Sequence, residues 1–143
     1  MIEQVITEND YYDGPKGGVA LFLGVPHRFS AEFDETHGEH FEIFLLWPIN
    51  EADLCLEIEQ WNIFVAWNDR YEAGTATTKT HPGHGGIDPR WDEIEEHLTT
   101  SRLAPRDHAI RAQGTFEQIA RDTRYTKSGP SYGVVWTVIS GAA

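Results

Sequence analysis

The feature that most constrains the fold is a change of hydrophobic periodicity at Asn50. Before this residue, apolar side chains recur at every second position in three segments, residues 19–23, 27–33 and 41–47. This alternation is typical of half-buried strands, and the third segment is largely apolar on both faces, which suits a central strand. The sequence therefore predicts three strands in its first third.

From Asn50 onward, the apolar spacing becomes that of a helix. Asn50 is a good N-terminal cap, and one long helix is predicted over residues 50–73. A second, shorter helix is predicted over residues 88–100, because Asp88 suits the cap position and Pro89 suits the first helical position.

Two more alternating segments, residues 110–116 and 131–139, predict two strands after the helices. Such runs of strands and runs of helices favour the α+β class over the alternating α/β class. We therefore expect an α+β fold with an antiparallel sheet of about five strands, three N-terminal and two C-terminal. This sheet is expected to pack on one long central helix plus a shorter second helix. No repeat or linker divides the sequence, so residues 1–143 are predicted to form a single domain.

The charge of the chain is strongly negative and unevenly spread. The net charge is −12, and residues 29–69 hold ten carboxylates without one Lys or Arg. A field of this sign repels nucleic acid and anionic membranes, so we expect neither as a partner. The same field attracts basic partners or metal cations. The candidate contacts for a basic protein partner are Glu32, Asp34, Glu35 and Glu39.

A single cysteine, Cys55, excludes an intramolecular disulfide and any metal site built from several thiolates. The N-terminal residues carry three acids and no long apolar run, so no signal peptide is predicted. No stretch approaches the roughly 18 apolar residues that a membrane-spanning helix requires. The sequence therefore predicts a cytoplasmic protein. Its strand edges also allow self-pairing into a homodimer.

The best local candidate for chemistry is the loop that contains His81 and His84. Two imidazoles three residues apart, in a segment rich in Pro and Gly, can converge on one divalent transition metal. Such a site would leave coordination positions for water and would make the protein a metal-assisted enzyme. The alternative is an exposed loop in which the two histidines only contribute polarity. No other cofactor is predicted.

A second candidate site lies along the predicted long helix. Glu57 and Asn68 lie near its apolar arc, with Trp61 between them. Polar groups among aromatic side chains can line a small-molecule pocket between sheet and helix. The same groups can instead mark the edge of the helix, where polar side chains reach water. Glu57, Trp61 and Asn68 are therefore the candidate ligand-binding residues.

Three functions remain open after a search for catalytic motifs. The sequence has no Walker A loop, no G-x-S-x-G elbow and no H-E-x-x-H pair, which leaves open whether the protein is an enzyme. Because the segregated charge is its least ordinary feature, the sequence favours a non-catalytic interaction domain that docks a basic partner. A metal-assisted enzyme and a small-molecule binder are the alternatives.

Overall fold

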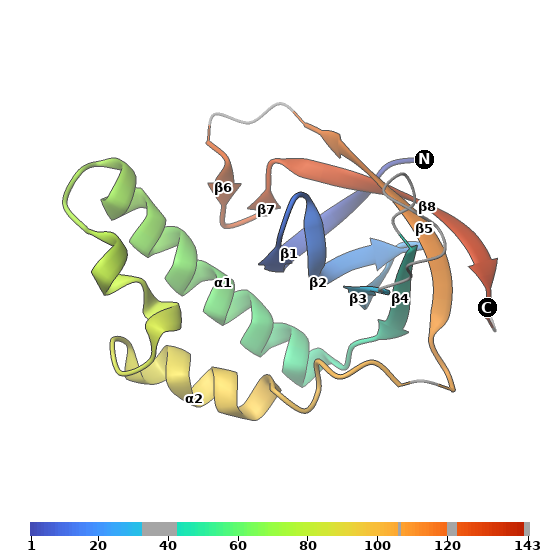
Figure 1. Ribbon diagram of the computed structural model, residues 1–143, viewed down its shortest axis with the longest axis horizontal. Helices are drawn as coiled ribbons and strands as arrows, with labels where there is room; N and C mark the ends of the chain where they lie inside the picture. Colours follow the sequence, from blue (N-terminus) through green and yellow to red (C-terminus); the bar gives the residue numbers. More distant parts are fainter. Residues whose placement is uncertain (33–42, 106, 120–122, 142–143) are drawn as a thin grey trace.

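Six antiparallel strands close into a barrel in the computed structural model, which describes residues 1–32, 43–105, 107–119 and 123–141. The strands follow the order β1-β2-β3-β4-β5-β8, and β8 pairs with β1 to complete the barrel (Figure 1). The barrel strands are β1 (Glu3–Tyr11), β2 (Pro15–Phe22), β3 (Val25–Ala31), β4 (Ile43–Pro48), β5 (Ile110–Gln118) and β8 (Tyr132–Ser140).

Two α-helices pack against each other beside the barrel (Figure 1). Between β4 and β5 the chain forms α1 (Glu51–Glu72), the short 3₁₀ helices η1 (Thr78–Thr80) and η2 (Pro82–His84), and α2 (Pro89–Leu98). A small ribbon, β6 (Tyr125–Thr126) and β7 (Gly129–Pro130), contacts β1 and α1. Within the described ranges, neither α1 nor α2 combines the length and the apolar character that crossing a membrane requires.

Both α-helices begin where their capping residues place them. The side chain of Asn50 accepts a hydrogen bond from the backbone N–H of Asp53 at 2.7 Å. The side chain of Asp88 accepts from the N–H groups of Arg90 and Trp91 at 2.9 and 3.1 Å. These caps satisfy backbone donors that have no partner within the first helical turn, which explains why the sequence located both starts correctly.

The expected α+β class, with an antiparallel sheet and two α-helices, is confirmed, but the expected five-stranded sheet is wrong. The sheet has six strands and closes on itself. The pattern missed β1 because only Val5 and Thr7 of this strand are buried, which leaves almost no alternation to detect. The sequence did not predict that the sheet closes into a barrel, because closure depends on pairs such as Glu3 with Val134, which are distant in the sequence.

The other predicted strands are present with shifted ends. β2 already begins at Pro15, and β3 begins at Val25. Residue 33 and residues 41–42, which belong to two predicted strands, lie outside the described residues. β4 pairs with β3 on one side and with β5 on the other, as expected for an apolar central strand.

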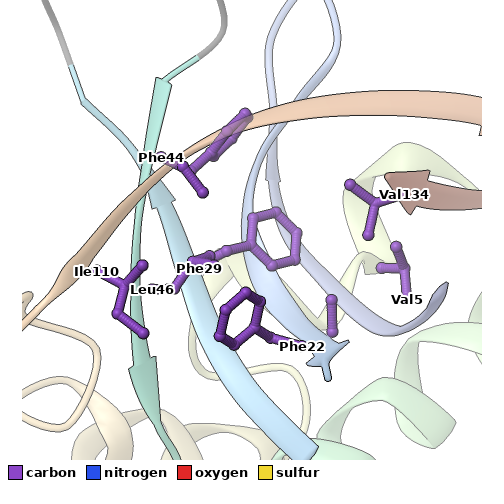
Figure 2. Packing of buried hydrophobic residues seen from close by; sticks show 9 residues of the cluster. Val5, Phe22, Phe29, Phe44, Leu46, Ile110 and Val134 are labelled. Carbon is purple, nitrogen blue, oxygen red and sulfur yellow. The ribbon is translucent and has the colours of Figure 1, made fainter. Parts of the chain in front are cut away.

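The barrel encloses the hydrophobic core (Figure 2). Phe44 belongs to this core and has no solvent exposure, and its ring centroid is 5.8 Å from that of Phe29. The same ring is 5.5 Å from Phe116 and 5.7 Å from Trp136. Gly114 pairs with Trp136, and a side chain here would overlap the rings of Trp136 and Phe44. Glycine at this position therefore lets aromatic rings from several strands meet inside the barrel.

Candidate functional site

A cleft of about 520 Å³ lies between β1, α1, α2 and the loop around η2. Small-molecule sites usually have volumes of roughly 300–1,000 Å³. The lining residues are Glu8, Asn9, Asp10 and Tyr11 of β1; Gln60, Trp61 and Phe64 of α1; His81, Gly83 and Gly85 of the loop; and Trp91, Asp92, Glu95, Glu96, Thr99 and Arg102 of α2 and the turn after it. The cleft thus combines four segments that are separated in the sequence.

Four rings form a continuous aromatic wall along the cleft: Trp61, Phe64, His81 and Trp91. The ring centroids of Trp61 and Phe64 are 5.4 Å apart, and those of Phe64 and His81 are 5.8 Å apart. His81 and Trp91 follow at 6.3 Å. Tyr125 packs edge-on against both Trp61 and Phe64, and the Trp61 indole N–H donates to a backbone carbonyl of β6 at 2.7 Å. These contacts hold the aromatic wall in place.

A buried carboxylate, Glu57, joins α1 to the barrel next to the cleft. It is 1% exposed and accepts hydrogen bonds from three side chains. Arg102 donates from Nη2 to Oε1 at 2.7 Å and from Nε to Oε2 at 3.0 Å. Arg28 of β3 donates from Nη1 to Oε2, and Asn9 of β1 donates to Oε1 at 3.2 Å. A carboxylate buried this deeply requires such pairing, so Glu57 acts as a structural connection between helix and barrel.

Arg102 links this buried network to the cleft. Its Nη1 donates to both carboxylate oxygens of Glu95, at 2.9 and 3.0 Å, and its Nη2 donates to Oε1 of Gln60 at 2.6 Å. Gln60 in turn donates to Glu95 at 2.8 Å. The guanidinium of Arg102 is therefore shared between two carboxylates, Glu57 and Glu95. Its charge is compensated before any ligand arrives.

Two carboxylates near the cleft have pKa values shifted in opposite directions. Burial would raise the pKa of Glu57, but the hydrogen bonds and charges of Arg102 and Arg28 outweigh burial and hold this pKa below its ordinary value. Burial raises the pKa of Glu8, against the opposing effects of Tyr132 and Arg124. The hydroxyl of Tyr132 donates to Glu8 at 2.6 Å. Burial thus increases the affinity of the Glu8 carboxylate for a proton.

The structure separates the three ligand-binding candidates of the long helix. Trp61 lines the cleft and belongs to its aromatic wall. Glu57 lies in the buried arginine network, so the alternative that placed it at a solvated helix edge is wrong. Asn68 is half-buried further along α1 and is not one of the described lining residues.

The two metal-site candidates, His81 and His84, lie on the loop that borders the cleft. Nδ1 of His81 accepts from the N–H of Gly83 at 2.9 Å, and Nε2 of His84 donates to the carbonyl of Thr78 at 2.8 Å. Their ring centroids are 5.8 Å apart. In the parts of the chain that the structure covers, no three residues among His, Cys, Asp and Glu are grouped to hold a metal ion. The hydrogen bonds assign both imidazoles a role in shaping the loop.

We expect the pKa of His81 to lie below its ordinary value of 6.5 in the folded protein, because burial and, secondarily, the neighbouring His84 lower it. As the pH falls through 6.5, the imidazole of His81 binds a proton more readily in the unfolded chain than in the folded protein. His81 therefore makes the free energy of unfolding fall as the solution is acidified. An NMR titration of its imidazole measures the pH of the midpoint, and a midpoint at or above pH 6.5 would contradict the prediction. His81→Asn keeps an acceptor for Gly83, and its stability should fall less steeply between about pH 7 and pH 5.

The four candidate contacts for a basic partner fall into two groups. Glu32 accepts a hydrogen bond from Nε of Arg111 at 2.8 Å, so part of its charge is already paired. Asp34, Glu35 and Glu39 lie outside the described residues.

Sequence reasoning missed most of the residues that form the cleft. Glu8 lies on the strand that the alternation pattern did not detect. Trp91 lies in the predicted second helix and Arg102 follows it, and no sequence motif marked either residue as part of a site. The available signal was the set of polar residues at buried positions of α1, such as Glu57 and Gln60, because buried polar groups require partners.

Comparison of the chain with protein-family models, with curated proteins and with solved structures finds no match.

Proposed function

We propose that this protein binds a small molecule in the cleft between β1, α1 and α2. The observation that carries the proposal is the cleft itself, a hollow of about 520 Å³ with a fixed aromatic wall and several polar side chains around it. Ligand sites typically combine apolar faces with a few well-placed polar groups in this way. Because β1, α1 and α2 together supply most of the lining, the site is built largely on regular elements, which hold a binding geometry well.

The pairing of charges within the chain supports a small-molecule ligand over the docking of a basic protein. Glu32 is bonded to Arg111, and Glu59 of the same acidic region is bonded to Arg90 at 2.8 Å. Such internal pairs reduce the negative field that the region projects outward. Docking through Asp34, Glu35 and Glu39 stays a prediction.

The proposal predicts that soluble fragments bind next to the indoles of Trp61 and Trp91. A set of cationic, neutral and anionic fragments should be titrated into the ¹⁵N-labelled protein, with the two indole N–H signals as reporters. Thr99 lines the cleft, whereas its neighbour Thr100 is exposed and is not a lining residue. Thr99→Trp should therefore fill the cleft and weaken binding at least about tenfold, which corresponds to 1.4 kcal/mol. Thr100→Trp is the matched control and should leave the affinity unchanged.

Two results would overturn the small-molecule proposal. One is that no fragment of any charge shifts the indole signals at millimolar concentration. The other is that Thr99→Trp and Thr100→Trp alter binding equally, which would place the fragments outside the cleft.

A further inference from the structure

We propose that the cleft is selective for an organic cation, a small molecule whose substituted ammonium group lies against the aromatic wall between flanking carboxylates. This inference rests on the proposed function and adds the chemical class of the ligand. It is carried by two independent properties of the lining, its charge and the arrangement of its rings.

Carboxylates outnumber cationic side chains in the lining. The acidic lining residues are Glu8, Asp10, Asp92, Glu95 and Glu96, and the basic one is Arg102. Arg102 is shared between Glu57 and Glu95, which leaves Glu8, Asp10, Asp92 and Glu96 as the lining acids that it does not bind. Clefts lined by one sign of charge concentrate ligands of the opposite sign. The lining therefore attracts a cation and repels an anion.

The aromatic wall places four neighbouring rings along the cleft, where an ammonium group can be desolvated. Trp61, Phe64, His81 and Trp91 are linked by centroid distances of 5.4, 5.8 and 6.3 Å. Cations bind to the faces of such rings, most strongly to Trp, through the negative charge of the ring face. The lowered pKa of His81 favours its neutral form, so this ring adds no repelling charge at neutral pH.

The dimensions of the cleft favour a molecule over a bare ion. A volume of about 520 Å³ accommodates a ligand of several heavy atoms. The lining carboxylates also come from different elements: Glu8 and Asp10 lie on β1, and the others lie on α2. Diffuse negative charge around an aromatic surface suits an ammonium group that carries apolar substituents.

Two pairs of probes, matched in shape and different in charge, test this inference. Choline is compared with 3,3-dimethylbutan-1-ol, and 2-phenylethylamine with 2-phenylethanol, using the indole signals of Trp61 and Trp91. We expect the cation of at least one pair to bind about tenfold more tightly than its neutral partner at low salt, and we expect this preference to shrink as salt is added.

A neutralising substitution tests the part played by the carboxylates. Glu96 is an exposed lining residue of α2, and Glu72 is an exposed acid at the end of α1 that is not a lining residue. Glu96→Gln should weaken binding of the preferred cation about threefold and leave its neutral partner unaffected. Glu72→Gln makes the same change in net charge and should leave both affinities unchanged.

The outcomes separate this inference from the proposed function. If neutral or anionic fragments bind in the cleft and neither cation binds more tightly than its partner, selectivity for cations is wrong and the small-molecule proposal stands. If Glu96→Gln and Glu72→Gln weaken cation binding equally, the preference comes from net charge and not from the cleft, which also overturns the inference. If no fragment binds at all, the proposed function fails together with it.

Discussion

Replacing Phe44 with Ala is expected to lower the free energy of unfolding by about 3–5 kcal/mol. Phe44 is fully buried, and its ring contacts Phe29, Phe116 and Trp136 at centroid distances of 5.5–5.8 Å. The substitution removes a large apolar surface and leaves a cavity that the rings of three other strands cannot fill without moving. Because closed barrels have no free edge, such movement spreads to paired strands on both sides.

The effect of Phe44→Ala can be measured by chemical denaturation followed by tryptophan fluorescence, to which the neighbouring Trp136 contributes. Phe44→Leu keeps part of the buried volume and should lose only about half as much stability. Tyr12→Ala removes an aromatic ring that is 79% exposed and should change stability by less than about 0.5 kcal/mol. A loss below about 1 kcal/mol for Phe44→Ala would mean that the barrel interior is not packed around this ring.

The sequence predicted the elements whose causes are local. The cap formed by Asn50 and the alternation in 27–33 depend on neighbouring residues, so both helix starts and most strands were located correctly. Barrel closure depends instead on pairs such as Glu3 with Val134, whose contact no local pattern reports. β1 was missed because only Val5 and Thr7 of it are buried, and its place in the sheet depends on pairing with β2 and β8.

The candidate site was predictable only in part. Trp61 was recognised as part of an aromatic group, and the structure assigns it to the aromatic wall of the cleft. Glu57 was recognised as an unusual polar residue near an apolar arc, but its role depends on Arg102, which is 45 residues away in the chain. Helical periodicity reports which residues share a face, and it does not report which partner satisfies a buried charge. The cleft itself is a product of tertiary packing.

Replacing Glu57 with Ala is expected to lower the free energy of unfolding by about 3–5 kcal/mol, because it leaves a buried guanidinium without its anion. The side chain of Arg28 is 4% exposed and forms an ion pair with Glu57, and within the described residues its Nη2 has no hydrogen-bond partner. Arg102 keeps Glu95 and Gln60 as partners. Chemical denaturation measures the loss. Glu59→Ala breaks an exposed ion pair on the same helix and should lose far less stability.

The pH dependence of this loss tests its electrostatic origin. The folded-state pKa of Glu57 lies below the ordinary value of 4.5, so the carboxylate contributes stability above that value and loses the contribution as pH falls through its folded pKa. The difference in stability between the wild-type protein and Glu57→Ala should therefore be largest near neutral pH and shrink in acid. A difference that stays constant down to the acid transition would indicate lost packing instead of a lost charge.

The double variant Arg28→Met/Glu57→Leu separates two quantities: the net contribution of the ion pair to stability, and the loss of stability when one buried charge is left unpaired. Removing both charges leaves no buried arginine without a partner, and the apolar side chains fill much of the same volume. We therefore expect the double variant to be more stable than Glu57→Ala, although it has lost both residues of the pair. If it is equally unstable or less stable, the hydrogen bonds that Glu57 accepts from Arg102 and Asn9 contribute more than the orphaned charge of Arg28.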